Sequence, residues 1–260
     1  MNFFFGIKNE YLSSLITIPK FQNSGIYLKD YSVFEAEPNN NNWTIKKSSY
    51  EQNDNFFFIK KELIENSKIF FLSSEREIND KYDNDFRKLK NLNNFTDTSP
   101  SAFRSNLRIY LKDGGFSSYQ SEYPFEMTGK KGNILSSVST LLDPMAEKNY
   151  IFFKNIFNLP IREKSFLYFV DILEKVVLDK IEIQSNFVNE IIVNKDLIKK
   201  NIYIFSQKYL GIPLYVSIND KHVSFEHTHP PHHYILSDDK FKLIKNLKMK
   251  IHEIIDQKTI

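Results

Sequence analysis

The chain contains no cysteine. A disulfide framework, a thiolate nucleophile, an iron–sulfur cluster and a cysteine-ligated zinc site are therefore excluded. Any bound metal would need nitrogen and oxygen ligands. Glycine is also scarce: there are 7 in 260 residues, and four of them fall between Gly114 and Gly132. Special backbone geometry is therefore expected mainly in that stretch.

Long apolar runs are absent as well, because none approaches the roughly 20 residues needed to cross a bilayer. The first residues carry no basic leader, so we expect no membrane span and a cytoplasmic location. The net charge of +3 is the small difference between 35 basic and 32 acidic residues. The lysines are scattered along the chain, which makes a nucleic-acid partner the less favoured expectation.

Short aromatic and β-branched runs separated by polar turns predict many strands. Residues 106–112 alternate apolar and polar, and Asp113-Gly114 supplies a hairpin turn. Residues 214–218 and 222–229 predict a second hairpin around Asn219-Asp220. Helical spacing predicts helices over 134–142 and from Asp196 towards Gly211, and a C-terminal amphipathic helix after residue 239. We therefore expect an α+β fold, mainly antiparallel sheet with a few helices.

A charged, asparagine-rich stretch precedes residue 101 and is the best candidate for a domain linker. The sequence divides there into a β-rich part, 1–95, and an α+β part, 96–260. A single continuous domain is the alternative.

Five of the six histidines lie within residues 222–233. If 222–229 is a strand, His227 and His229 share one face, and two imidazoles at that spacing suit a divalent metal, zinc first among them. His232 or His233, after Pro230-Pro231, would supply a third ligand or an acid/base group. Glu226 points the other way and is the general-base candidate. The alternatives are a polar ligand held without metal, or surface imidazoles with no specific role.

Two resemblances each cover one short stretch. His227-Thr228-His229-Pro230 with Ser237 resembles the metal-binding loop of JAMM-type isopeptidases, but Lys240 stands where that family has aspartate. His222-Val223-Ser224-Phe225 resembles one half of the paired motif of the two-histidine phosphoesterases, and the chain has no second copy. The sequence therefore assigns no family.

The glycine-rich stretch encloses hydroxyl, amide, carboxylate and aromatic side chains, which suit a sugar or another polyhydroxylated ligand. Two neighbouring arginines favour an anionic one. A plain hairpin followed by a surface turn is the alternative interpretation. The predicted ligand-binding residues are Arg104, Arg108, Ser117, Tyr119, Gln120 and Glu122.

Two functional hypotheses follow. The first is a cytoplasmic enzyme, a metal-dependent hydrolase or a sugar-modifying enzyme, acting on a sugar- or phosphate-containing small molecule through the histidine-rich site. The second is a non-catalytic protein that binds a glycan or another chain through its tyrosines. The first hypothesis requires that the histidine tract and the glycine-rich loop lie together.

Overall fold

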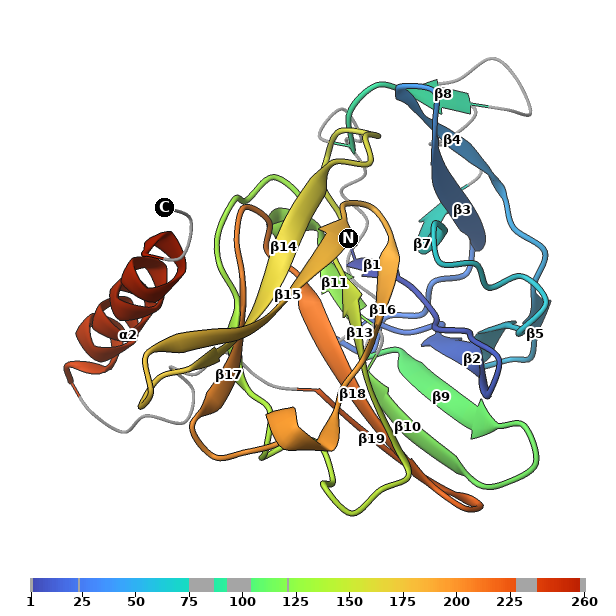
Figure 1. Ribbon diagram of the computed structural model, residues 1–260. Coiled ribbons are helices and arrows are strands. Elements are labelled where there is room, and N and C mark those ends of the chain that lie inside the picture. Colours follow the sequence, from blue (N-terminus) through green and yellow to red (C-terminus); the bar gives the residue numbers. More distant parts are fainter. Residues whose placement is uncertain are drawn as a thin grey trace.

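The computed structural model describes residues 2–22, 24–74, 87–92, 104–120, 122–227 and 238–257 (Figure 1). The described strands form four antiparallel sheets. Sheet I has the order β11 (Glu122–Pro124), β1 (Asn2–Phe4), β7 (Ile69–Ser74), β3 (Tyr31–Asn39), β4 (Asn42–Lys47) and β8 (Arg87–Leu89). Sheet II has the order β10 (Phe116–Gln120), β9 (Asn106–Leu111), β2 (Leu12–Pro19), β6 (Phe56–Ile59) and β5 (Glu51–Gln52).

The second half of the chain builds the two other sheets. Sheet III has the order β12 (Leu135–Ser137), β17 (Ile202–Ser206), β14 (Lys164–Asp171) and β15 (Val176–Gln184). Sheet IV has the order β16 (Val188–Ile192), β13 (Lys148–Lys154), β18 (Ile212–Asn219) and β19 (His222–His227). Two short 3-10 helices, η2 (Phe125–Met127) and η3 (Lys195–Leu197), and the helix α2 (Lys240–Asp256) complete the elements used below.

The elements pack as layers, with α2 on one side and sheets I and II on the other (Figure 1). Strand β13 lies between two of these layers and contacts both. Its Ile151 and Phe153 pack with residues of sheet III, whereas Tyr150 and Phe152 join the core shared with sheets I and II. Because both faces of β13 are covered, its sequence is a continuous buried run instead of an alternating one.

Helix α2 covers the outer face of sheet III. Ile251, Ile254 and Ile255 pack against Val170 and Phe205 of that sheet. These three isoleucines lie on one side of a helix with 3.6 residues per turn, so the predicted C-terminal amphipathic helix is confirmed. No helix among the described residues is long and apolar enough to span a membrane.

The predicted α+β class is wrong, because four antiparallel sheets dominate the described residues and α2 is the one α-helix among them. Residues 134–142 contain β12 followed by turns, and the stretch after Asp196 contains η3 and β17. In both stretches the residues spaced as a helical stripe are mostly β-branched or flanked by serine and threonine, which disfavour helices. Pairing of β12 with β17 then buries Leu135 and Phe205 in the strand form.

The proposed division at residue 95 lies within 93–103, outside the described residues. Strands on both sides of it pair with one another. β9 pairs with β2, and β11 pairs with β1. Sheets I and II therefore draw on residues from both predicted parts.

Candidate functional site

The two predicted hairpins lie against each other. β9 and β10 form the first, and β18 and β19 form the second. Their turns touch, because Gly115 N donates a hydrogen bond to the carbonyl of Lys221 at 2.7 Å. A Cβ on Gly114 would come within 2.7 Å of that carbonyl oxygen. The glycine pair therefore permits a close approach of two backbones.

The contact between the hairpins continues along the strands. The rings of Tyr119 and His227 meet edge to face with centroids 4.2 Å apart, and Tyr119 also lies 6.3 Å from Phe225. The histidine strand and the glycine-rich hairpin are therefore neighbours in space. His227 is half-buried there, whereas His222 and Glu226 are exposed on the opposite face of β19.

The described residues do not contain the predicted metal-binding histidine cluster. Within the described part of the chain, no group of three or more histidine, aspartate or glutamate side chains could hold a metal ion. The two described histidines of the tract, His222 and His227, lie on opposite faces of β19. His229, His232 and His233 lie outside the described residues.

The predicted carbohydrate-binding loop is also corrected, because its residues do not form one site. The register of β10 on β9 puts Ser117 and Tyr119 beside the buried residues Ile109 and Leu107. Gln120 lies on the other face, where Arg108 also points. One ligand could not contact Ser117 and Tyr119 on one face of the hairpin and Gln120 and Arg108 on the other face at the same time.

Arg104 and Glu122 lie where the chain enters this hairpin, and their interactions there involve the backbone. Glu122 Oε1 accepts a hydrogen bond from Ser105 N at 2.6 Å, and Arg104 has a positive φ of 25°. Burial raises the pKa of the Glu122 carboxyl, against the opposing effects of the Ser105 hydrogen bond and the Arg104 charge. These contacts fix the chain where it enters β9.

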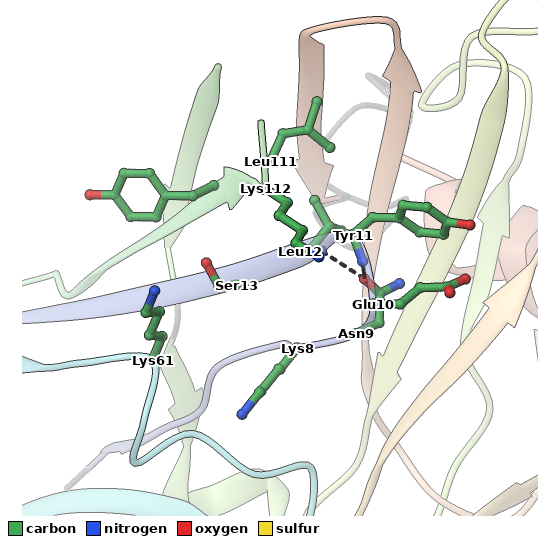
Figure 2. Close-up of a pocket in the computed structure, with 10 residues that line it drawn as sticks. Lys8, Asn9, Glu10, Tyr11, Leu12, Ser13, Lys61, Leu111 and Lys112 are labelled. Atoms are coloured by element: carbon green, nitrogen blue, oxygen red, sulfur yellow. Dashed lines mark hydrogen bonds between the residues drawn. The ribbon is translucent and has the colours of Figure 1, made fainter. Parts of the chain in front are cut away.

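A cavity of about 500 Å³ opens at one end of sheet II, and sequence reasoning missed it (Figure 2). It lies where β2 and β9 run side by side, beneath the segment between β1 and β2. None of the described residues that were predicted as a site lines it. Its lining residues are Lys8, Asn9, Glu10, Tyr11, Leu12, Ser13, Lys61, Tyr110, Leu111 and Lys112.

Asn9 builds the turn that shapes one wall. Its Oδ1 accepts hydrogen bonds from the backbone N–H groups of Tyr11 at 3.0 Å and Leu12 at 2.8 Å, drawn as dashed lines in Figure 2. Its Nδ2 donates to Glu190 Oε1 of β16 at 2.7 Å. The Tyr11 carbonyl accepts from Lys112 N at 2.9 Å. The wall is thus fastened to sheets II and IV, which makes it a preformed feature.

The electrostatics of this cavity are cationic. Lys8, Lys61 and Lys112 contribute ammonium groups, and none of the three forms an ion pair with a described residue. Glu10 is the one carboxylate among the described residues that line the cavity. The hydroxyls of Ser13 and Tyr110 add hydrogen-bonding groups. Three cations against one carboxylate favour an anionic ligand.

Comparisons of the chain with protein-family models, with curated proteins and with solved structures found no match.

Proposed function

We propose that this protein binds a phosphate-bearing ligand in the cationic cavity at the end of sheet II. The observation that carries the proposal is that Lys8, Lys61 and Lys112 all line one concavity and have no ion-pair partners among the described residues. An anion entering there would meet several ammonium groups, and partial enclosure by protein strengthens each interaction over its value in open water.

The geometry supports binding more than it supports chemistry. The cavity wall is held by hydrogen bonds that the Asn9 side chain accepts from the Tyr11 and Leu12 backbone N–H groups, so little ordering would accompany ligand entry. The lining residues offer cations, hydroxyls and a tyrosine ring, which recognise a phosphate and the polar group attached to it.

Titration calorimetry with pyrophosphate as the probe tests this proposal. Wild-type protein is expected to bind it, and Lys61→Ala together with Lys112→Ala should weaken binding at least tenfold. Lys200→Ala, which removes an exposed lysine outside the cavity, is the matched control and should leave the affinity within twofold. Failure of wild-type protein to bind pyrophosphate, or equal binding by the double variant, would contradict the proposal.

Catalysis on a phosphate-bearing small molecule is a second candidate, favoured by the contact between Tyr119 and His227. An imidazole beside a phenol is a combination that can move a proton near neutral pH. In this catalytic proposal, His227 acts as the acid/base group. Hydrolysis of p-nitrophenyl phosphate that is lost in His227→Ala and kept in His222→Ala would support it, and absence of hydrolysis by wild-type protein would count against it.

A further inference from the structure

The cationic cavity continues into a half-exposed sheet surface. The strand registers place Ser13 opposite Tyr110, Leu15 opposite Arg108 and Thr17 opposite Phe58. Directly paired residues share a face, so these side chains all lie on the side of sheet II that faces away from the core. We call this surface the outer face of sheet II; it consists of Ser13, Leu15, Thr17, Phe56, Phe58, Asn106, Arg108, Tyr110, Phe116, Ser118 and Gln120.

Aromatic rings stand on this surface in two pairs. Tyr110 and Phe116 lie 6.0 Å apart between centroids, and Phe56 and Phe58 lie 6.3 Å apart. Phe116 is 60% exposed and Phe56 is 37% exposed, which is unusual for phenylalanine on a folded domain. Tyr110 and Phe58 are two strands apart across the sheet and four residues apart along it, which corresponds to about 16 Å. A ligand confined to the cavity would leave Phe116 in water.

Cationic groups accompany the rings. The Arg108 guanidinium lies 4.9 Å from the centre of the Phe116 ring, and its Nε is buried without a hydrogen-bond partner in the described structure. The three lysines of the cavity lie at the end of the face where Ser13 pairs with Tyr110. Lys60 is already paired with Glu51 at the far edge.

We propose that the outer face of sheet II, together with the cavity, binds single-stranded nucleic acid. The inference rests on the proposed function, because the cavity lysines would hold phosphates of the strand. The exposed rings would then stack on its unpaired bases, and the arginine beside Phe116 would pair with a further phosphate. Cations that follow a backbone beside aromatic platforms are the recognised basis of single-strand binding.

The argument from scattered lysines does not apply to this surface. Lys8, Lys61 and Lys112 are far apart in sequence, but the fold brings them to one cavity. The bases of a duplex are stacked on one another and unavailable to side-chain rings, so the exposed aromatics favour an unpaired strand over a double helix. The serine, threonine, asparagine and glutamine side chains on the face can hydrogen-bond to base edges without selecting one sequence.

Fluorescence anisotropy with a labelled 12-nucleotide single strand tests the proposal, with a duplex of the same sequence alongside. Wild-type protein is expected to bind the single strand more tightly than the duplex and more tightly than pyrophosphate. Lys61→Glu should weaken binding at least tenfold, whereas Lys200→Glu, which changes net charge equally, should have little effect. Four phosphate contacts, from the three cavity lysines and Arg108, predict a slope of log affinity against log salt of roughly −3.

A second pair of variants isolates the aromatic contribution. Phe116→Ala should weaken binding of the single strand roughly tenfold, the order expected for loss of one stacked base. Phe241→Ala removes a ring of similar exposure, 63% against 60%, from helix α2 and should leave binding unchanged. A strong loss in pyrophosphate binding is not expected from Phe116→Ala, since that ring is outside the cavity lining.

The outcomes separate the two proposals. If pyrophosphate binds and is lost in the cavity variants, but the single strand binds no more tightly than pyrophosphate, the nucleic-acid inference is overturned and the proposed function stands. If neither probe binds, both fail. Equal weakening by Lys61→Glu and Lys200→Glu, or binding of dextran sulfate with the same affinity and no effect of Phe116→Ala, shows general polyanion attraction and overturns the inference.

Discussion

The Tyr119 ring meets the His227 ring edge to face, and the two residues belong to different sheets. Tyr119 comes from β10 at the edge of sheet II, and His227 comes from the end of β19 at the edge of sheet IV. Each strand is an edge strand of its own sheet, and edge strands need protection from pairing with other chains. The contact therefore belongs to a seam in which each hairpin covers the exposed edge of the other.

The closest backbone approach in this seam gives the first prediction. Gly114→Ala would place a methyl group 2.7 Å from the Lys221 carbonyl oxygen and 3.0 Å from its Cα, and backbone atoms cannot move aside cheaply. We expect a loss of about 2 kcal/mol in the free energy of unfolding, measured by urea denaturation.

Gly115→Ala is the control for that variant. The added Cβ would lie 3.2 Å from the Lys221 carbonyl oxygen, and no other contact within 4 Å is found among the described residues. The loss in free energy of unfolding should therefore be clearly smaller than for Gly114→Ala. Equal stability of the two variants would mean that the hairpin turns are not packed as closely as the distances indicate.

Local alternation was enough to predict both hairpins of the seam. Leu107 and Ile109 alternate with polar residues along β9, and the buried Phe225 alternates with exposed Ser224 and Glu226 along β19. In each case one face of the strand is covered and the other faces water, so the sequence repeats every two residues. The same reasoning predicted that His227 lies on the side of Phe225.

Periodicity failed where strands are buried on both faces or are short. Ile198, Ile202 and Phe205 are spaced as in a helix, yet Ile202 and Phe205 belong to β17 and are buried by different neighbours. Phe205 packs against α2, whereas Ile202 packs between sheets III and IV. A strand in the middle of stacked layers has no polar face, so an accidental helical spacing of apolar residues cannot be recognised from the sequence.

The cavity could not be predicted for a different reason. Its cations come from three separate segments, the approach to β2, the turn after β6 and the turn after β9. No local motif links Lys8, Lys61 and Lys112. The histidine tract, by contrast, is dense in sequence, and its two described members, His222 and His227, lie on opposite faces of β19.

Asn186 gives a second prediction, because it organises the turn between β15 and β16. Its Oδ1 accepts from Phe157 N at 2.7 Å, and its Nδ2 donates to the carbonyls of Leu159 at 2.7 Å and Ile161 at 2.9 Å. It is 1% exposed and has a φ of 57°. Asn186→Ala would leave the buried Phe157 N–H without its acceptor, would remove the hydrogen bonds to the Leu159 and Ile161 carbonyls, and would strain the backbone.

We expect Asn186→Ala to lose about 4 kcal/mol of unfolding free energy. Asn40→Ala provides a matched control, since Asn40 also has a positive φ, 44°, but is exposed. It should lose about 1 kcal/mol from backbone strain alone. Guanidinium denaturation of both variants measures the difference, and similar losses would show that the side-chain hydrogen bonds of Asn186 contribute little.

The packing of α2 on sheet III gives a third prediction. Ile251 is 0% exposed within the cluster that includes Val170 and Phe205. Ile251→Ala should therefore lower the free energy of unfolding by about 3 kcal/mol through lost burial and an unfilled cavity. Met249→Ala, at a position that is 50% exposed on the same helix, should change it by less than about 0.5 kcal/mol. A small effect of Ile251→Ala would mean that the helix is not firmly docked in solution.

Lys154 gives the last prediction, because it is fully buried at the end of β13. Its Nζ donates to the carbonyl of Asn66 at 3.3 Å, and it forms no ion pair with a described residue. Burial, with a smaller effect of the Arg162 charge, lowers the pKa of the Lys154 ammonium to about 7 from its ordinary 10.5. Between these two values the unfolded chain carries a proton that the folded chain lacks, so stability from this group rises with pH.

Lys154→Met keeps the length of the side chain and removes the titrating group. The Asn66 carbonyl retains its hydrogen bond from Val188 N at 2.8 Å, so no buried acceptor is left alone. We expect the variant to be more stable than wild type at pH 7, by about 2 kcal/mol, and the advantage to shrink as pH rises to 9. Urea denaturation at pH 7, 8 and 9 measures this difference, with the exposed Lys200→Met as control. A stability difference that stays constant across this range would show that folding does not lower the pKa of Lys154.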